Sequence, residues 1–123
     1  MITGLVTPNR EAVIRLPVRG EDTRADTVDA IIDTGFAGYL TLPTRLVTDL
    51  DLTFAGATRA VLADGSEVQL AVFEAVVVWD DQERRVLALA TRGSALVGMS
   101  LLSGSRVTLD VHAGGLVTVE ALG

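Results

Sequence analysis

The residues best suited to chemistry in this chain are one aspartate and the turn that follows it. Asp33 ends the apolar run Ala30-Ile31-Ile32 and precedes Thr34-Gly35. Glycine permits a close approach of the backbone in a tight turn, so the pattern places a carboxylate at the exit of a strand. Burial raises the pKa of a carboxyl group, and a second carboxylate beside it raises one of the two further, so that such a pair shares a proton.

Two carboxyl groups in that state can hydrolyse an amide bond. The ionised acid accepts a proton from a water molecule held between the two acids, and the water attacks the carbonyl carbon while the protonated acid donates to the carbonyl oxygen. The chain contains Asp-Thr-Gly once. A second copy of Asp33 would therefore have to come from another subunit across a twofold axis.

The elements that would position Asp33 are expected to be strands. Apolar and polar residues alternate along much of the chain, and turn residues separate the runs, which is typical of an all-β sandwich or barrel. We expect strands over Glu11–Val18, Thr27–Asp33, Arg59–Leu62, Glu67–Leu70, Phe73–Trp79, Arg85–Ala90, Ala95–Gly98, Arg106–Val111 and Leu116–Leu122.

Turns and short helices connect these strands. Asp64-Gly65 between two alternating runs predicts the tip of a hairpin, and residues 80–83 predict a second, polar turn. Pro43 fits the first turn of a short helix that Thr41 caps or that extends from Thr44 to Leu50. Residues 99–102 fit a brief helical turn. We expect residues 1–123 to form a single domain, because no linker or repeat interrupts the pattern.

Composition narrows the range of functions. The formal net charge is −6, all ten basic residues are arginines scattered along the chain, and cysteine is absent. We therefore expect no nucleic-acid partner, no disulfide and no thiolate site. No run approaches the roughly 18 apolar residues of a membrane-spanning helix and no signal peptide is recognisable, so we expect a cytoplasmic protein without a membrane partner.

Three segments, in this order, carry a resemblance to a known family. The first is Asp33-Thr34-Gly35 with its continuation through Pro43, the second is Ala63-Asp64-Gly65-Ser66, and the third is residues 96–102, Leu-Val-Gly-Met-Ser-Leu-Leu. Together they span most of the chain. They resemble the retropepsin-like aspartic peptidases, most closely the small prokaryotic members.

The resemblance implies a closed all-β barrel with one or two short helices, active only as a homodimer. It assigns catalysis to Asp33, support of the catalytic loop to Thr34 and Gly35, and a structural role to Gly98. It further implies an endopeptidase that acts on polypeptides without metal or cofactor. Other residues would cover or contact the substrate, namely Ala63, Asp64, Gly65 and Ser66 as the flap and Ala37, Gly38, Leu62 and Val97 as pocket residues.

Two further expectations come from the resemblance. Relatives pair their termini in a shared sheet, so Met1–Val6 and Leu116–Leu122 are candidate dimer contacts. Phe36 departs from the small residue, alanine or serine, that follows the glycine in viral relatives, and it cannot hydrogen-bond the carboxylate as serine can. The alternative function is therefore an inactive dimer of the same fold that binds a peptide or a partner protein.

Other reactive residues support weaker hypotheses. His112 is the only histidine and is expected at a strand end on the surface. Ser100 follows Gly98 but lacks the second glycine of a nucleophile elbow. Asp80, Asp81 and Glu83 form an acidic turn that offers fewer ligands than a calcium loop needs.

Overall fold

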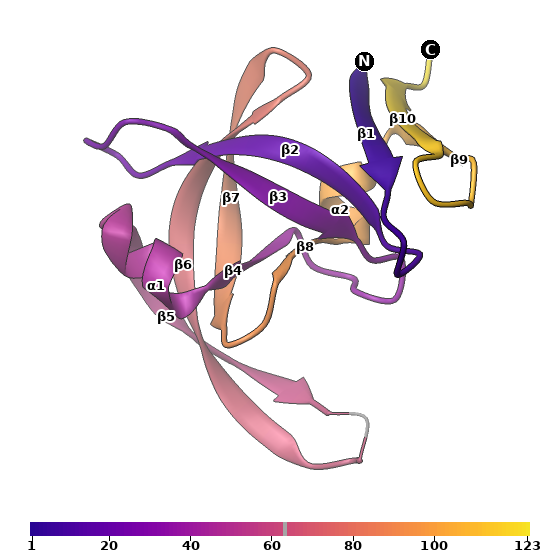
Figure 1. The fold of residues 1–123 in the computed structure, drawn as a ribbon. Coiled ribbons are helices and arrows are strands. Elements are labelled where there is room, and N and C mark those ends of the chain that lie inside the picture. The colour runs from indigo at the N-terminus through magenta and orange to yellow at the C-terminus, as the bar shows by residue number, and fades with distance from the viewer. Residues whose placement is uncertain (63) are drawn as a thin grey trace.

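The computed structural model describes residues 1–62 and 64–123 and shows an all-β architecture (Figure 1). Ten strands and two short helices follow one another in the order β1 (Ile2–Val6), β2 (Ala12–Arg19), β3 (Asp26–Ile32), β4 (Leu40–Pro43), α1 (Thr44–Asp49), β5 (Thr53–Val61), β6 (Glu67–Trp79), β7 (Gln82–Thr91), β8 (Ala95–Val97), α2 (Met99–Leu102), β9 (Ser105–Leu109) and β10 (Leu116–Ala121).

Six strands close into a barrel. Their order is β2-β3-β8-β4-β7-β6, and β6 returns to β2 through the pairs Val18↔Val77 and Arg19↔Val76. Most neighbours are antiparallel, but β3 runs parallel to β8 and β4 runs parallel to β7. The predicted closed all-β barrel with short helices is thereby confirmed.

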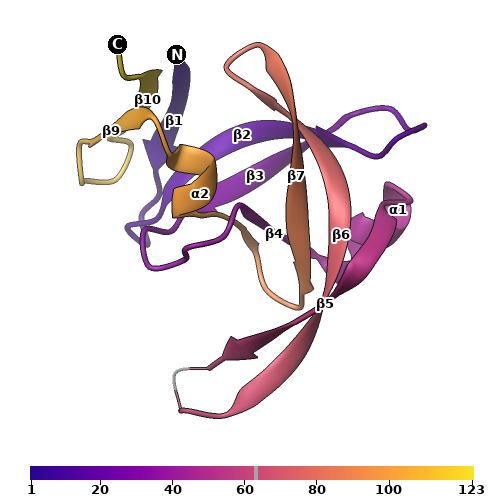
Figure 2. The same cartoon turned by 180° about the vertical axis from the view of Figure 1, so that it is seen from behind.

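Two extensions leave the barrel. The distal parts of β5 and β6 form a hairpin that projects away from it, and β1, β10 and β9 continue the sheet outward from β2, with the two chain ends side by side (Figures 1 and 2). Within the described part of the chain, neither helix is long enough to cross a membrane.

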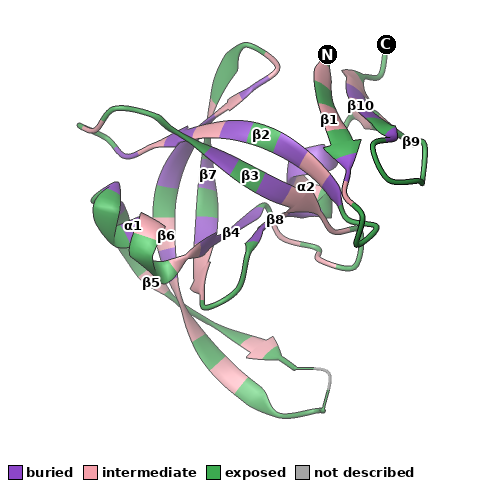
Figure 3. Ribbon diagram, in the orientation of Figure 1, coloured by how far each residue is buried: buried purple, intermediate pink, exposed green. Residues whose placement is uncertain are grey.

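The core fills the barrel because one face of each barrel strand is apolar. Ile14, Leu16 and Val18 of β2 alternate with less buried residues, as the period of two in a strand requires. Burial is concentrated in the barrel, whereas the projecting β5–β6 hairpin is largely exposed (Figure 3). Burial of apolar area at about 25 cal/mol per Å² stabilises the barrel, while the hairpin contributes little to it.

Of the two predicted forms of the first helix, the one from Thr44 to Leu50 agrees with α1 to within one residue, and the one capped by Thr41 is wrong. Pro43 is the last residue of β4 and occupies the N-cap position, and α1 begins at Thr44 without a side-chain cap. Thr41 does not cap the helix. Its side chain is buried, where Oγ1 donates to the carbonyl of Ser94 at 3.2 Å and accepts the N–H of Leu96 at 2.9 Å.

Several strand boundaries also differ. The two predicted runs between Glu67 and Trp79 are one strand, β6, which pairs with β5 along its first part and with β7 along its second. The turn to β7 contains only Asp80 and Asp81, because Gln82 already pairs with Trp79. The predicted strand Arg59–Leu62 covers only the end of β5, which begins at Thr53, and no strand was predicted at β1 or β4. The remaining predicted strands agree with the structure to within a few residues.

Candidate functional site

The Asp33 turn follows directly on β3, where that strand lies beside β8. Ile32 pairs with Val97 in the parallel ladder, and the N–H of Asp33 donates to the carbonyl of Val97 at 2.9 Å. The half-buried carboxylate accepts the N–H of Gly35 at Oδ1 over 2.9 Å, and the N–H of Phe36 donates to the carbonyl of Asp33. The main chain on both sides of the carboxylate is thus fixed by hydrogen bonds.

A second set of hydrogen bonds joins the turn to the start of α2. The N–H of Met99 donates to the carbonyl of Phe36 at 2.8 Å, and the N–H of Gly98 donates to the carbonyl of Tyr39 at 3.0 Å. Ser100 adds a side-chain bond from Oγ to the carbonyl of Ala37 at 2.6 Å. The loop after Asp33 is therefore attached to a segment about sixty residues away in the sequence.

The ring of Phe36 lies between two glycines. A Cβ atom on Gly98 would come within 2.1 Å of the carbonyl oxygen of Gly38 and 2.6 Å of the Phe36 ring, and one on Gly38 would come within 2.6 Å of the same ring. These glycines are needed for close approach rather than for an unusual backbone angle. Phe36 contributes packing here, and its side chain has no atom that could hydrogen-bond Asp33.

The fold brings together most residues predicted for the catalytic loop. Thr34, Gly35 and Ala37 are exposed beside Asp33, and Gly38 is half-buried. Val97 is fully buried in the core, so its contact with the turn is through its backbone carbonyl. Ser100 and Thr41 were not singled out for the loop by the sequence, because their partners are brought near only by the pairing of β8 with β3 and β4.

The hairpin predicted as a flap belongs to the β5–β6 projection, which leaves the barrel (Figure 1). Asp64 Oδ1 accepts the N–H of Ser66 at 2.8 Å and its hydroxyl at 2.6 Å, and these bonds lower the pKa of Asp64. Gly65 has φ +85, a left-handed backbone that favours glycine. Leu62 is exposed, and Ala63 is outside the described residues.

The chemistry that one chain can offer at this turn is limited. Asp33 can donate or accept a proton, but no second carboxylate is hydrogen-bonded to it among the described residues. No group of three acidic or histidine side chains gathers as a metal site in the same part of the chain.

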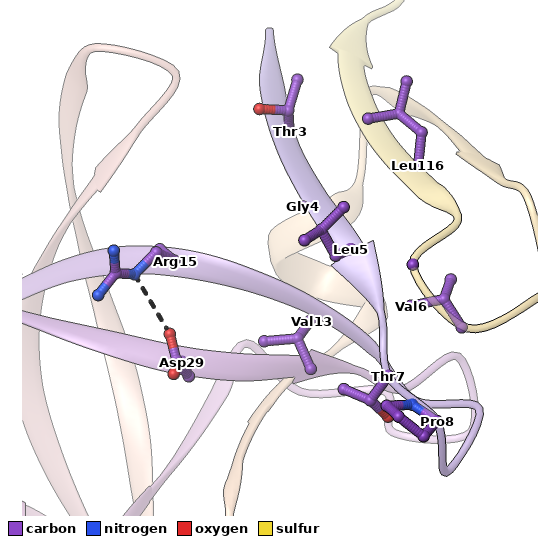
Figure 4. Close-up of a pocket in the computed structure, with 11 residues that line it drawn as sticks. Thr3, Gly4, Leu5, Val6, Thr7, Pro8, Val13, Arg15, Asp29 and Leu116 are labelled. Atoms are coloured by element: carbon purple, nitrogen blue, oxygen red, sulfur yellow. Dashed lines mark ion pairs between the residues drawn. The ribbon is translucent and has the colours of Figure 1, made fainter.

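A large hollow lies elsewhere, between the outer faces of β1, β2 and β3 (Figure 4). Its volume is about 690 Å³, and Leu5, Val13 and Leu116 contribute apolar side chains to it. At one end Arg15 Nε lies 3.4 Å from Asp29 Oδ1, and both side chains are exposed. Asp33 does not line this hollow, so its size alone does not connect it with the candidate site.

Comparison with known proteins gives a match of fold. No family model matches the chain, and no curated protein matches it in sequence. A crystal structure of a retropepsin-like aspartic protease from Rickettsia conorii superposes with a TM-score of 0.61 at 16% identity, covering 98% of this chain and 90% of the other. The chain therefore has the fold of a retropepsin-like aspartic protease over nearly its whole length.

Proposed function

We propose that this chain is an aspartic endopeptidase whose active form is a homodimer. The observation that carries the proposal is the position of Asp33, half-buried in a turn fixed on both sides by the main chain of β8 and α2. A structural neighbour of the same fold, described as a retropepsin-like aspartic protease, supports the same reading. An exposed acid on a mobile loop would not give a defined geometry for proton transfer.

The reaction follows from two copies of this turn. One Asp33 carboxylate, ionised, takes a proton from a water molecule lying between the copies, and the water oxygen attacks the peptide carbonyl carbon. The other Asp33, protonated, donates to the carbonyl oxygen. Gly35 N–H holds one carboxylate oxygen, which fixes the orientation of the acid and leaves its other oxygen available for the water.

The substrate is proposed to be an extended polypeptide. A strand-like segment can hydrogen-bond to exposed backbone edges. The projecting β5–β6 hairpin offers one such edge along β5, which pairs with no strand but β6 among the residues that the structure describes. In this proposal residues 63–66 cover the substrate, while Ala37, Gly38 and Leu62 contact its side chains. The main chain at the hairpin tip is held by Leu62 N–H to the carbonyl of Ser66 at 2.8 Å.

The test is the substitution Asp33→Asn. We expect cleavage of a mixed peptide library, measured by mass spectrometry between pH 4 and 7, to fall more than about 10³-fold because the proton donor and acceptor are lost. Asp29→Asn is the matched control, since Asp29 lies on β3, the strand that precedes Asp33, and is exposed. Both variants should keep the far-ultraviolet circular dichroism of the unchanged protein.

The alternative function is a dimeric module that binds peptides without cleaving them. Phe36 favours it, since its ring packs against Gly38 and Gly98 and has no atom that could hydrogen-bond the carboxylate. An unchanged protein that binds library peptides but leaves them intact at every pH would support the module. Cleavage that persists in Asp33→Asn would contradict the peptidase mechanism proposed here.

A further inference from the structure

A row of apolar side chains crosses the outer face of the sheet from β10 to β8. Residues directly opposite each other on neighbouring strands point to the same face, and the pairs of this row follow one another without a gap. They are Leu116 with Leu5, Leu5 with Val13, Val13 with Ile31, and Ile31 with Leu96. Leu5 is 58% and Leu116 49% exposed, and the other three are half-buried. These five residues, the outer row, form a continuous apolar surface that is separate from the barrel core.

The outer row reaches the candidate site through β3. Ile31 lies two residues before Asp33, and side chains two apart on a strand point to the same face. The N–H of Asp33 donates to the carbonyl of Val97 at 2.9 Å, so the contact between β3 and β8 continues to this residue. The Asp33 carboxylate and the Ile31 side chain therefore lie on the same face of the sheet, about 7 Å apart along the strand.

The far end of the outer row lies in the hollow between β1, β2 and β3 (Figure 4). Leu5, Val13 and Leu116 line this hollow, and its volume of about 690 Å³ is typical of a pocket that encloses an organic group. At its charged end Arg15 and Asp29 contact each other, so together they add no net charge. An uncharged apolar group therefore fits the hollow better than an ion does.

The spacing of the strands relates the hollow to Asp33. Leu5 lies two strands away from Ile31, which is about 10 Å across the sheet, and Asp33 lies about 7 Å further along β3. The direct distance from Asp33 to the hollow is then about 12 Å. An extended polypeptide covers this distance in about three to four residues, because each residue adds about 3.3 Å.

We propose that the hollow binds a large apolar side chain of the polypeptide substrate, aromatic or branched aliphatic, about three to four residues from the cleaved bond. The inference rests on the proposed function, since the position is counted from Asp33, and it adds a requirement on the substrate. Apolar area buried at this distance stabilises the bound substrate and the transition state equally. It therefore lowers KM and leaves kcat unchanged.

The experiment begins with a library of random dodecapeptides. Asp33→Asn protein, which keeps the hollow but loses the acid, selects binders from the library, and we expect an aromatic or branched aliphatic residue to recur at one position. Selected peptides are then incubated with the unchanged protein, and mass spectrometry locates the cleaved bond. We expect this bond about three to four residues from the recurring apolar residue.

The substitution Leu5→Gln tests whether the hollow holds that residue. Leu5 is mostly exposed, so the variant should fold, and circular dichroism checks this. In the Asp33→Asn background we expect the selected peptides to bind about tenfold more weakly, measured by fluorescence anisotropy, because a polar amide replaces apolar surface. With Asp33 restored, KM for these peptides should rise by a similar factor at unchanged kcat. Peptides shortened to exclude the apolar residue should not distinguish the two proteins, whereas a general structural defect would affect them as well.

The matched control is Leu87→Gln, since Leu87 is 50% exposed, lies on β7 and does not line the hollow. It should leave both the affinity and KM unchanged. If Leu5→Gln lowers folding stability, Val13→Thr gives a second test, because it adds a hydroxyl to the hollow at nearly constant side-chain shape, and it should weaken binding in the same way. Sedimentation velocity shows whether any variant changes the association of the protein.

Four results would each overturn the inference about the hollow: equal affinity of selected peptides for Leu5→Gln, no recurring apolar residue, a cleaved bond at another distance, or no peptide that binds. A variant that changes association and leaves peptide affinity unchanged would assign the hollow to a contact between copies of the chain, and the peptide inference would be wrong. Selected peptides that need Leu5 but are never cleaved would contradict the proposed function alone. Cleavage that depends on Asp33 but not on Leu5 would contradict the inference about the hollow alone.

Discussion

At the scale of single residues, the Asp33 turn depends on two glycines, because any side chain at these positions would clash with it. Gly38 and Gly98 leave the space that the ring of Phe36 and the carbonyl of Gly38 occupy. The backbone of Gly98 then donates to Tyr39, and that of Met99 donates to Phe36. Close packing in protein interiors leaves little tolerance for one added carbon, so the position of the carboxylate is coupled to these glycines.

Gly98→Ala is therefore expected to destabilise the chain by about 3 kcal/mol or more, as overpacking in a tight interior does. The new Cβ would lie 2.1 Å from a backbone oxygen, which cannot rotate away. Urea denaturation followed by circular dichroism measures the change. Gly93→Ala is the control, because a Cβ atom there would meet no described residue beyond its chain neighbours within 4 Å. Equal stability of the two variants would contradict the packing described here.

At the scale of secondary-structure elements, the sequence predicts those strands whose apolar pattern can be recognised without knowing their neighbours. The ranges found for β2, β3, β8 and β10 follow apolar patterns that are visible locally. Strand β4 was not predicted. It has only four residues and directly precedes α1, so its sequence resembles the start of a helix. The continuity of β6 was missed because it is set by partners on two different strands.

In the candidate site, too, local patterns are predictable from the sequence and contacts between distant segments are not. The Asp33 turn is predictable because Asp-Thr-Gly after an apolar run is a local signal. The bonds from Ser100 to Ala37 and from Leu96 to Thr41 are not, because each joins residues more than fifty positions apart. Such contacts depend on which strands become neighbours, and no periodicity in the sequence specifies that.

The turn between β6 and β7 gives an element-scale prediction. Asp80 and Asp81 have φ +52 and +68, so both adopt the left-handed backbone of a type I′ turn. Glycine takes this conformation at lower cost than aspartate, so Asp81→Gly is expected to stabilise the protein by up to about 1 kcal/mol.

Thermal unfolding compares Asp81→Gly with Asp81→Ala, which should unfold at a lower temperature than the unchanged protein because alanine tolerates the left-handed region poorly. Asp80 is left unchanged, since its carboxylate contacts the amino group of Met1. A lower melting temperature for the glycine variant would show that the Asp81 side chain contributes more than the backbone strain costs.

At the scale of the whole molecule, the barrel closes through a short contact. Only two residue pairs join β2 to β6, and two ion pairs lie beside them. Arg19 Nε is 2.8 Å from Glu83 Oε2, and Arg85 Nη1 is 2.6 Å from Glu21 Oε2. Both pairs connect the end of β2 and its following turn to β7, so they bridge the seam where the sheet meets itself.

These pairs make closure of the barrel depend on pH. Hydrogen bonds from Arg85 and Arg19 lower the pKa of Glu21 and of Glu83 below their usual value. A carboxylate with a lowered folded-state pKa stabilises the protein above its unfolded-state pKa, and that contribution is lost as pH falls through the folded-state value. Acidification below about pH 4.5 should therefore weaken the seam.

The double substitution Glu21→Gln with Glu83→Gln tests this linkage. At pH 6 we expect its melting temperature to be lower than that of the unchanged protein by a few degrees at most, because exposed ion pairs contribute little. The difference should shrink between pH 4.5 and 3, and also in 1 M NaCl at pH 6, which screens such pairs. Glu11→Gln, exposed and distant from the seam, should follow the unchanged protein at every pH. If the difference in melting temperature stays constant on acidification, the glutamates act through packing. A contribution from their charge would disappear once the carboxylates are protonated.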